Sequence, residues 1–211
     1  MHRPDRVRTP WMAATVVAVI AVATVSCGND AATASLRGAV RTPALQVGSI
    51  TLPDAANAGA PTPMRAPAGQ LYLVYFGYTS CPDVCPTTLS DIRVALDDLP
   101  AALASRVTVA MATVDPERDT DEVLTGYLAH FFDHSIALRQ TDPSALAAAA
   151  GTFGVKWEVE AHEAGAAYDV SHTAVTYVVD DTGTVVVEWP FGFDTADMTS
   201  DITTLLEEET T

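Results

Sequence analysis

Basic residues are scarce in this chain of 211 residues, which has 11 Lys and Arg against 27 Asp and Glu and a formal net charge of −16. Three of the arginines precede the first apolar run, so the rest of the chain has only seven Arg and Lys156. A protein that binds nucleic acid needs a basic surface to neutralise phosphates. The composition therefore argues against nucleic acid as a partner, and it fits a cation, a basic partner or simply solubility.

Long apolar runs are also lacking, apart from one near the N-terminus. Residues 11–25 form an apolar stretch that is short for a membrane span of about 20 residues but suits the core of an export signal. Small residues before Cys27 resemble a bacterial lipobox, in which the cysteine is lipidated. We expect residues 1–27 to be an export signal and Cys27 to anchor the protein to the extracytoplasmic face of the bacterial cell membrane. An uncleaved signal anchor is the alternative.

Cysteine is rare as well, with three in the chain. If Cys27 carries lipid, Cys81 and Cys85 remain as a pair four positions apart in an oxidising compartment. A disulfide across so short a loop would add little stability. The pair therefore indicates chemistry, either as a redox dithiol or as part of a metal site.

Strand and helix patterns alternate along the rest of the chain. Residues 28–43 are small and polar and predict a flexible tether, and residues 44–208 predict one domain. The apolar run 71–76 is typical of a strand covered on both faces. Further patterns predict a helix that Pro100 ends, a strand at 107–114, helices at 120–132 and 142–154, a hairpin at 173–188 and a last helix after Asp194. This alternation predicts an α/β fold with a mixed central sheet flanked by helices and a hairpin near the C-terminus.

The two cysteines lie in the turn between the strongest strand and the helix that follows. Such a turn falls at the carboxyl end of the strand, where open α/β sheets bind ligands. Pro86 suits a first helical turn, so Cys85 should lie at a helix N-terminus. The unpaired amides and the helix dipole there favour thiolates, which serve both as nucleophiles and as metal ligands.

His172 is the candidate third member of this site, because it directly precedes the hairpin strand and can reach the same edge of the sheet. Two thiolates and one imidazole suit copper, Cu(I) in particular, although zinc accepts the same ligands. Three of the other histidines have ordinary explanations. His130 and His134 lie near a helix end, where histidine is favoured, and His162 lies in an acidic stretch that predicts a solvated loop.

Three acidic residues are candidates for tuning the site from outside the ligand set. Asp83 lies between the cysteines, Asp115 follows the second strand, and Asp169 lies three positions before His172. Capping of the next helix is the default role of the segment 114–120, yet its place at a strand end puts Asp115 on the same edge as the cysteines.

Together these segments resemble the Sco/SenC family of copper chaperones. The resemblance rests on the block 75–89 with its two cysteines, on 114–120 and on 171–180, in the family's order. It implies a thioredoxin-like, three-layer fold. It also implies that one copper ion, as Cu(I), Cu(II) or both, is bound by the residues that match the family's ligands, which are Cys81, Cys85 and His172.

The resemblance further implies a role in assembling the CuA centre of cytochrome c oxidase. The expected partners are its subunit II or another exported cuproprotein, an unidentified copper donor, and the membrane through the lipid anchor. One departure concerns the histidine motif. The family usually has Asp-His-Ser where this chain has Ser171-His172-Thr173, with Asp169 two positions before the usual acid. An acid adjacent to His172 is therefore missing.

Three functions compete on this evidence. A membrane-tethered copper chaperone needs Cys81, Cys85 and His172, whereas a thiol-disulfide reductase needs only the cysteines. Three residues separate the cysteines rather than the two of thioredoxin, and 171–173 contain no proline, which disfavours the reductase. The third function is a sensor of redox state or copper. Enzymatic activity thus stays open, with the chaperone favoured.

Overall fold

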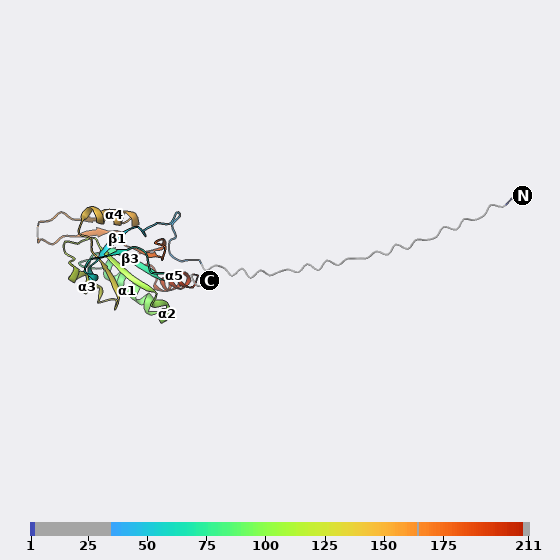
Figure 1. The fold of residues 1–211 in the computed structure, drawn as a ribbon, viewed down its shortest axis with the longest axis horizontal. Coiled ribbons are helices and arrows are strands. Elements are labelled where there is room, and N and C mark those ends of the chain that lie inside the picture. Colours follow the sequence, from blue (N-terminus) through green and yellow to red (C-terminus); the bar gives the residue numbers. More distant parts are fainter. Residues whose placement is uncertain (3–34, 164, 209–211) are drawn as a thin grey trace. The chain divides into compact units, whose positions relative to one another are not determined.

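The structure is a computed structural model that describes residues 1–2, 35–163 and 165–208. The export signal and Cys27 lie outside these residues. The described residues from 35 onward form one compact unit (Figure 1), which is built on a seven-stranded sheet with the order β2-β1-β5-β4-β3-β8-β9. These strands are β1 (Thr51–Asp54), β2 (Ala60–Pro63), β3 (Leu71–Gly77), β4 (Val107–Thr113), β5 (Ser135–Leu138), β8 (Val175–Val179) and β9 (Val185–Pro190).

The helices and a small second sheet complete the fold. The helices are η1 (Ala55–Asn57), α1 (Val84–Asp97), α2 (Ala101–Ala104), α3 (Asp121–Leu128), α4 (Pro143–Phe153) and α5 (Thr195–Glu208). The second sheet is a hairpin of two short antiparallel strands, β6 (Trp157–Val159) and β7 (Val170–His172). Within the described ranges, no helix has the length and apolar character needed to cross a membrane.

The central strand β3 sets the architecture. It pairs in parallel with β4 from Leu71↔Val107 to Gly77↔Thr113, and β8 pairs antiparallel along its other side. The predicted mixed sheet is thus confirmed. Because parallel strands end at one edge of a sheet, the chain leaves β3 and β4 at adjacent points. The loop with Cys81 and the segment with Asp115 therefore start side by side.

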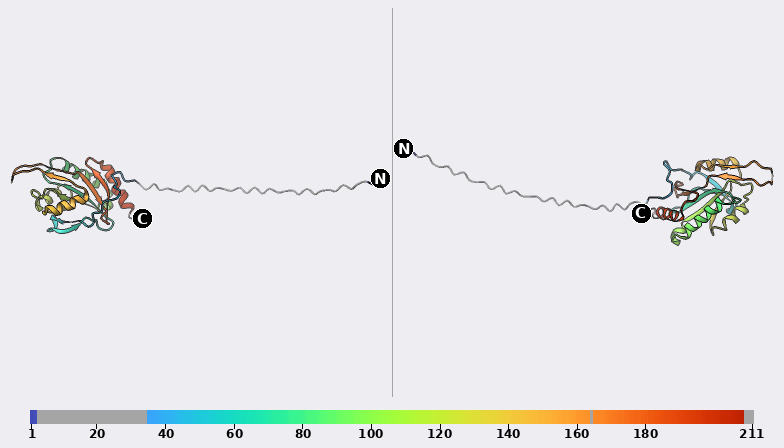
Figure 2. Two further views of the ribbon diagram at one scale, coloured as in Figure 1. Left: turned by 90° about the horizontal axis from the view of Figure 1, so that it is seen from above. Right: turned by 180° about the vertical axis from the view of Figure 1, so that it is seen from behind.

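Helices cover both faces of this sheet. The hydroxyl of Tyr75 reaches Cys85 of α1, whereas the ring of Phe76 packs 5.1 Å from the ring of Phe153 in α4. Successive strand residues point to opposite faces, so α1 and α4 lie on opposite sides (Figure 1). Helix α5 packs beside α1 (Figure 2). The three-layer arrangement explains why the run 71–76 is continuously apolar.

The structure differs from the prediction mainly between α4 and β8. Glu158 and Val159 from the stretch expected to be a solvated loop instead belong to β6, in which Trp157 pairs with His172, whereas His162 does lie in the largely exposed loop that joins β6 to β7. His172 therefore ends its own short strand rather than introducing the next one. Strands of three residues give too little pattern for a period of two to be read from sequence.

The carboxylate of Asp201 fastens the start of the described chain to the body. This residue of α5 is 1% exposed and accepts hydrogen bonds from the amides of Arg37 and Gly38 and from the indole of Trp189, at 2.6, 3.0 and 2.9 Å. Arg41 adds a two-pronged ion pair with Glu188 of β9. These residues of the predicted tether therefore pack against the domain.

Replacing Asp201 by alanine should lower the free energy of unfolding by about 3 kcal/mol, because three donors lose a buried, charged acceptor. Urea denaturation monitored by circular dichroism measures this. Asp197, on the same helix, has a half-exposed side chain 4.0 Å from Arg37, so Asp197→Ala should cost less than about 1 kcal/mol. Equal losses in the two variants would contradict the role given to Asp201.

Candidate metal centre

The two cysteines lie where β3 gives way to α1. Cys85 is buried in the first turn of the helix, and Cys81 is partly exposed on the loop before it. The amide of Cys85 donates to the sulfur of Cys81 at 3.3 Å, and the hydroxyl of Tyr75 lies 3.6 Å from the sulfur of Cys85. An amide at the helix N-terminus thus points at a cysteine sulfur, as expected for this turn.

His172 approaches the cysteines from the β6–β7 hairpin. Its Nε2 lies 3.3 Å from the sulfur of Cys85, and the ligand atoms of Cys81, Cys85 and His172 all lie within 4.8 Å of one another. Its Nδ1 lies 3.1 Å from the carbonyl oxygen of Thr173. A carbonyl can only accept, so Nδ1 carries the proton and the lone pair of Nε2 faces the sulfurs.

The hydrogen bond to Thr173 provides a partner for the second ring nitrogen of His172, although the sequence has no acid adjacent to this histidine. A metal-binding imidazole usually donates its second nitrogen to a carboxylate, a backbone carbonyl or water. The residue before the histidine is Ser171 rather than an acid, and the backbone of Thr173 provides the acceptor. The ring orientation is fixed without an acidic neighbour.

Burial dominates the electrostatics of the ligands. It raises the pKa of the Cys85 thiol to about 12, although contacts from Tyr78 and Tyr75 act in the opposite direction. Burial also lowers the pKa of His172, so its imidazole is neutral. In the metal-free protein, desolvation of Cys85 thus opposes the thiolate that a helix N-terminus favours.

Gly77 makes room for the buried cysteine. A Cβ at this position would lie 2.6 Å from the Tyr75 ring, 3.0 Å from the Cys85 sulfur and 3.3 Å from the side chain of Met111. A larger residue would push against the ligand itself. In the sequence, Gly77 is only one residue of the block 75–89, because this close approach arises when α1 folds over the end of β3.

Asp119 holds the cysteine loop in place. It is fully buried, and its carboxylate accepts hydrogen bonds from the amide and hydroxyl of Thr79 and from the hydroxyl of Thr113. These contacts join the loop after β3 to the end of β4. The capping role expected of this segment falls to Thr120, which accepts from the amide of Val123 at the start of α3.

The three acidic residues predicted to tune the site lie in different surroundings. Asp83 is exposed and accepts from Thr87, and Asp169 is exposed on the hairpin. Asp115 is 2% exposed and is bound by Arg118 and by the hydroxyl of Tyr168. Asp115 is therefore the buried one of the three, and it faces partners that sequence analysis did not identify.

The donor set fits a soft metal ion. An ion that bonds to nitrogen and sulfur at about 2.0–2.3 Å holds these atoms at separations similar to those among the ligand atoms of Cys81, Cys85 and His172. Thiolate and imidazole together suit copper or zinc and exclude hard cations such as Mg²⁺. A surface pocket of about 290 Å³ opens beside Tyr78, Cys81 and His172, so the site is accessible from outside.

Known proteins resemble this chain in sequence and in fold. The model of the SCO1/SenC family matches residues 51–207. The SCO2-like protein of Rickettsia prowazekii is 35% identical over 116 residues, which are 54% of this chain and 56% of the relative. The chain thus spans less than two thirds of that curated relative's length.

Solved structures extend the comparison. The apo Sco1 protein of Thermus thermophilus is 32% identical, with a TM-score of 0.69 over 81% of this chain and 97% of the neighbour. The structure of ScoI from Bradyrhizobium japonicum with copper bound is 30% identical, with a TM-score of 0.62 over 73% and 95%. The expected thioredoxin-like fold is confirmed.

The raised pKa of Cys85 can be measured in the metal-free, reduced protein. The rate of alkylation of each cysteine, followed by peptide mass against pH, reports its thiolate fraction. The rate at Cys85 should keep rising beyond about pH 8.5, where an ordinary thiol levels off, toward its pKa of about 12. The same measurement in urea is the control, and a native profile identical to the unfolded one would contradict burial as the cause.

Proposed function

The chain belongs to the SCO1/SenC family, and from this premise we propose that it is a copper chaperone that holds one copper ion through Cys81, Cys85 and His172. The observation that carries the proposal is the convergence of two sulfurs and one imidazole nitrogen within 4.8 Å. Copper-bound ScoI, a structural neighbour, favours copper over zinc as the ion that these ligands take.

The surroundings of the ligands suit transfer as well as binding. Cys85 is buried, whereas Cys81 and His172 border the open pocket. An incoming ligand from an acceptor can therefore approach at Cys81 and displace the chain's ligands one at a time. Copper binding also releases the proton of the Cys85 thiol, so ion uptake and proton loss are linked at this site.

Location and partner follow from the N-terminal pattern and from the family resemblance. Lipidation of Cys27 would hold the domain at the outer face of the cell membrane and raise its effective concentration near membrane acceptors. The acceptor we propose is the CuA centre of cytochrome c oxidase subunit II, or another exported cuproprotein, with a separate copper donor.

A thiol-disulfide reductase is the second candidate function. Cys81 and Cys85 are both free, and their sulfurs lie within 4.8 Å of each other. Such a pair can reduce a disulfide in an exported cuproprotein by becoming oxidised itself. This activity would not need His172, and that difference separates the two functions.

Replacing His172 by alanine should weaken Cu(I) binding more than the about 100-fold that loss of an outer hydrogen-bond partner costs. Anaerobic competition with a chromogenic Cu(I) chelator measures the affinity of the reduced protein. His134→Ala, at an exposed histidine, is the matched control and should bind as the wild type. Unchanged affinity in His172→Ala would overturn the proposed ligand set.

The cysteines distinguish chaperone from reductase. Cys81→Ser and Cys85→Ser should each abolish both copper binding and disulfide formation, whereas His172→Ala should retain a dithiol that oxidises to a disulfide. Each variant is tested for metallation of a copper-free CuA domain. Full support of assembly by His172→Ala would favour the reductase over the chaperone.

A further inference from the structure

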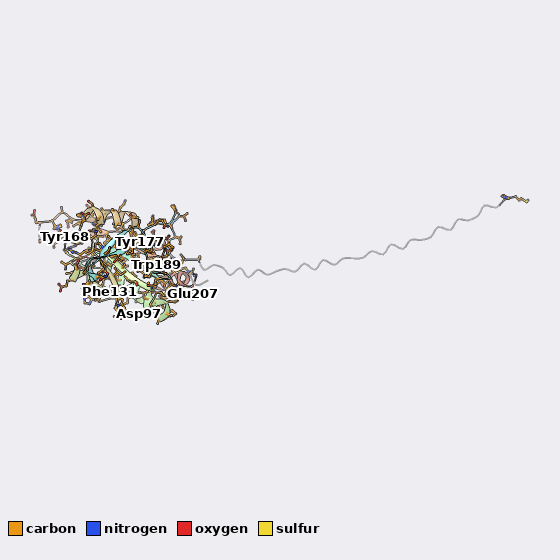
Figure 3. The ribbon with its side chains drawn as sticks, viewed as in Figure 1. Asp97, Phe131, Tyr168, Tyr177, Trp189 and Glu207 are labelled. Atoms are coloured by element: carbon orange, nitrogen blue, oxygen red, sulfur yellow. The ribbon has the colours of Figure 1, made fainter. Side chains whose placement is uncertain are left out.

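One residue of the loop that joins β6 and β7 is buried although the loop itself projects from the body. Figures 1 and 2 show the projecting orange loop in each view. Ala167 and Asp169 are exposed, whereas Tyr168 between them is only 8% exposed. Figure 3 places Tyr168 at the end of the body opposite Glu207. Tyr168 is thus the one buried side chain among the described residues of this loop, 160–163 and 165–169, which indicates an anchor.

Three side chains hold this anchor. The hydroxyl of Tyr168 donates to the buried carboxylate of Asp115 at 2.8 Å. Its ring lies between the guanidinium of Arg118, 3.7 Å from the ring centroid, and the imidazole of His162, stacked at 3.6 Å. Arg118 also donates to the carbonyl oxygen of Tyr168 at 3.0 Å and to Asp115. The anchor thus combines charged hydrogen bonds with cation–π and ring stacking.

The anchor connects the hairpin to the cysteine loop. Arg118 lies 5.6 Å from the ring of Tyr78, which belongs to the loop that carries Cys81. The ring of Tyr78 in turn meets the ring of His172 edge-on, with centroids 5.8 Å apart. Arg118 therefore contacts both elements whose separation fixes the distance between the histidine and the cysteines.

Tyr168 lies close to His172 along the chain, so a change in its position can shift His172. Only Asp169 separates it from β7, and His172 is the last residue of that strand. Strand β7 pairs with β6 and lies outside the seven-stranded sheet. The main sheet resumes at Val175 in β8, so its ladder constrains His172 from the C-terminal side, and the contacts of the hairpin with the body constrain it from the N-terminal side.

We propose that Asp115, Arg118 and Tyr168 form a latch that positions His172 against the two cysteines and so sets how tightly the chain holds its copper ion. The inference rests on the proposed function, because it takes His172 as a ligand. Tyr168 and Arg118 are positioning residues that act through the hairpin, and they complete what the backbone of Thr173 begins at the imidazole ring.

The test compares Cu(I) affinities of the reduced, full-length protein by chelator competition. Tyr168→Phe removes only the hydroxyl that binds Asp115, and Tyr168→Ala removes the ring as well. Both should weaken binding, by about 10- to 100-fold for loss of the latch, with the smaller effect in Tyr168→Phe. Tyr72→Phe, at the partly buried start of β3, is the matched control and should leave the affinity unchanged.

A double-mutant cycle separates positioning from general destabilisation. In the His172→Ala background, Tyr168→Phe should change the affinity by less than about twofold, because the residue through which it acts is gone. Amide hydrogen exchange in residues 157–172 should be faster in Tyr168→Phe than in wild type, and unchanged in Tyr72→Phe. If Tyr168→Ala does not fold, the cycle with Tyr168→Phe decides.

The outcomes distinguish the latch from the proposed function. If His172→Ala leaves the affinity unchanged, the ligand set fails and the latch fails with it. If His172→Ala weakens binding but Tyr168→Phe does not, the ligand set stands and the latch is overturned. An effect of Tyr168→Phe that persists without His172 also overturns the latch, since it would then act on the cysteines or on the fold.

Discussion

The parallel pairing of β3 with β4 is the constraint on which the site depends. Because Gly77 lies opposite Thr113, the chain leaves both strands at one edge of the sheet. The cysteine loop and the segment 114–120 are then close enough for Asp119 to bind the hydroxyls of Thr79 and Thr113. A shift of one residue in this register would separate these groups and move each side chain of β3 to the opposite face of the sheet.

The ligands are held at different depths, and the depth sets their chemistry. Cys85 is buried against Tyr75 and Gly77, where desolvation keeps its thiol protonated in the absence of metal. Cys81 is nearer to solvent and receives the amide of Cys85. Cys81 therefore offers the sulfur nearer to solvent, and Cys85 offers the sulfur that has to lose a proton before it can bind a metal ion.

The third ligand comes from an element that the main sheet does not include. Hairpin β6–β7 brings His172 to the cysteines, and its backbone acceptor at Thr173 fixes the ring. The site is therefore divided between the β3–α1 turn, which carries the two cysteines, and the separately anchored β6–β7 hairpin, which carries the histidine. Such a division would suit release of the ion as well as its binding, as the proposed chaperone role requires.

Sequence alone determined the succession of β3, α1, β4, α3, α4, the β8–β9 hairpin and α5, the position of the cysteines between β3 and α1, and the identity of the third candidate, His172. It could do so because buried strands and amphipathic helices leave periodic patterns, and because the motif residues are contiguous. The hairpin pattern at β8–β9 was equally readable, with Gly183 at a positive φ in its turn.

Only the tertiary structure decided how these parts act on one another. The pKa of Cys85 depends on how deeply α1 buries it, the acceptor for His172 is a backbone atom, and the roles of Asp119, Arg118 and Tyr168 arise from contacts between distant segments. Local patterns encode which residues form an element. Desolvation and side-chain contacts across elements are set by packing, which no short stretch of the chain contains.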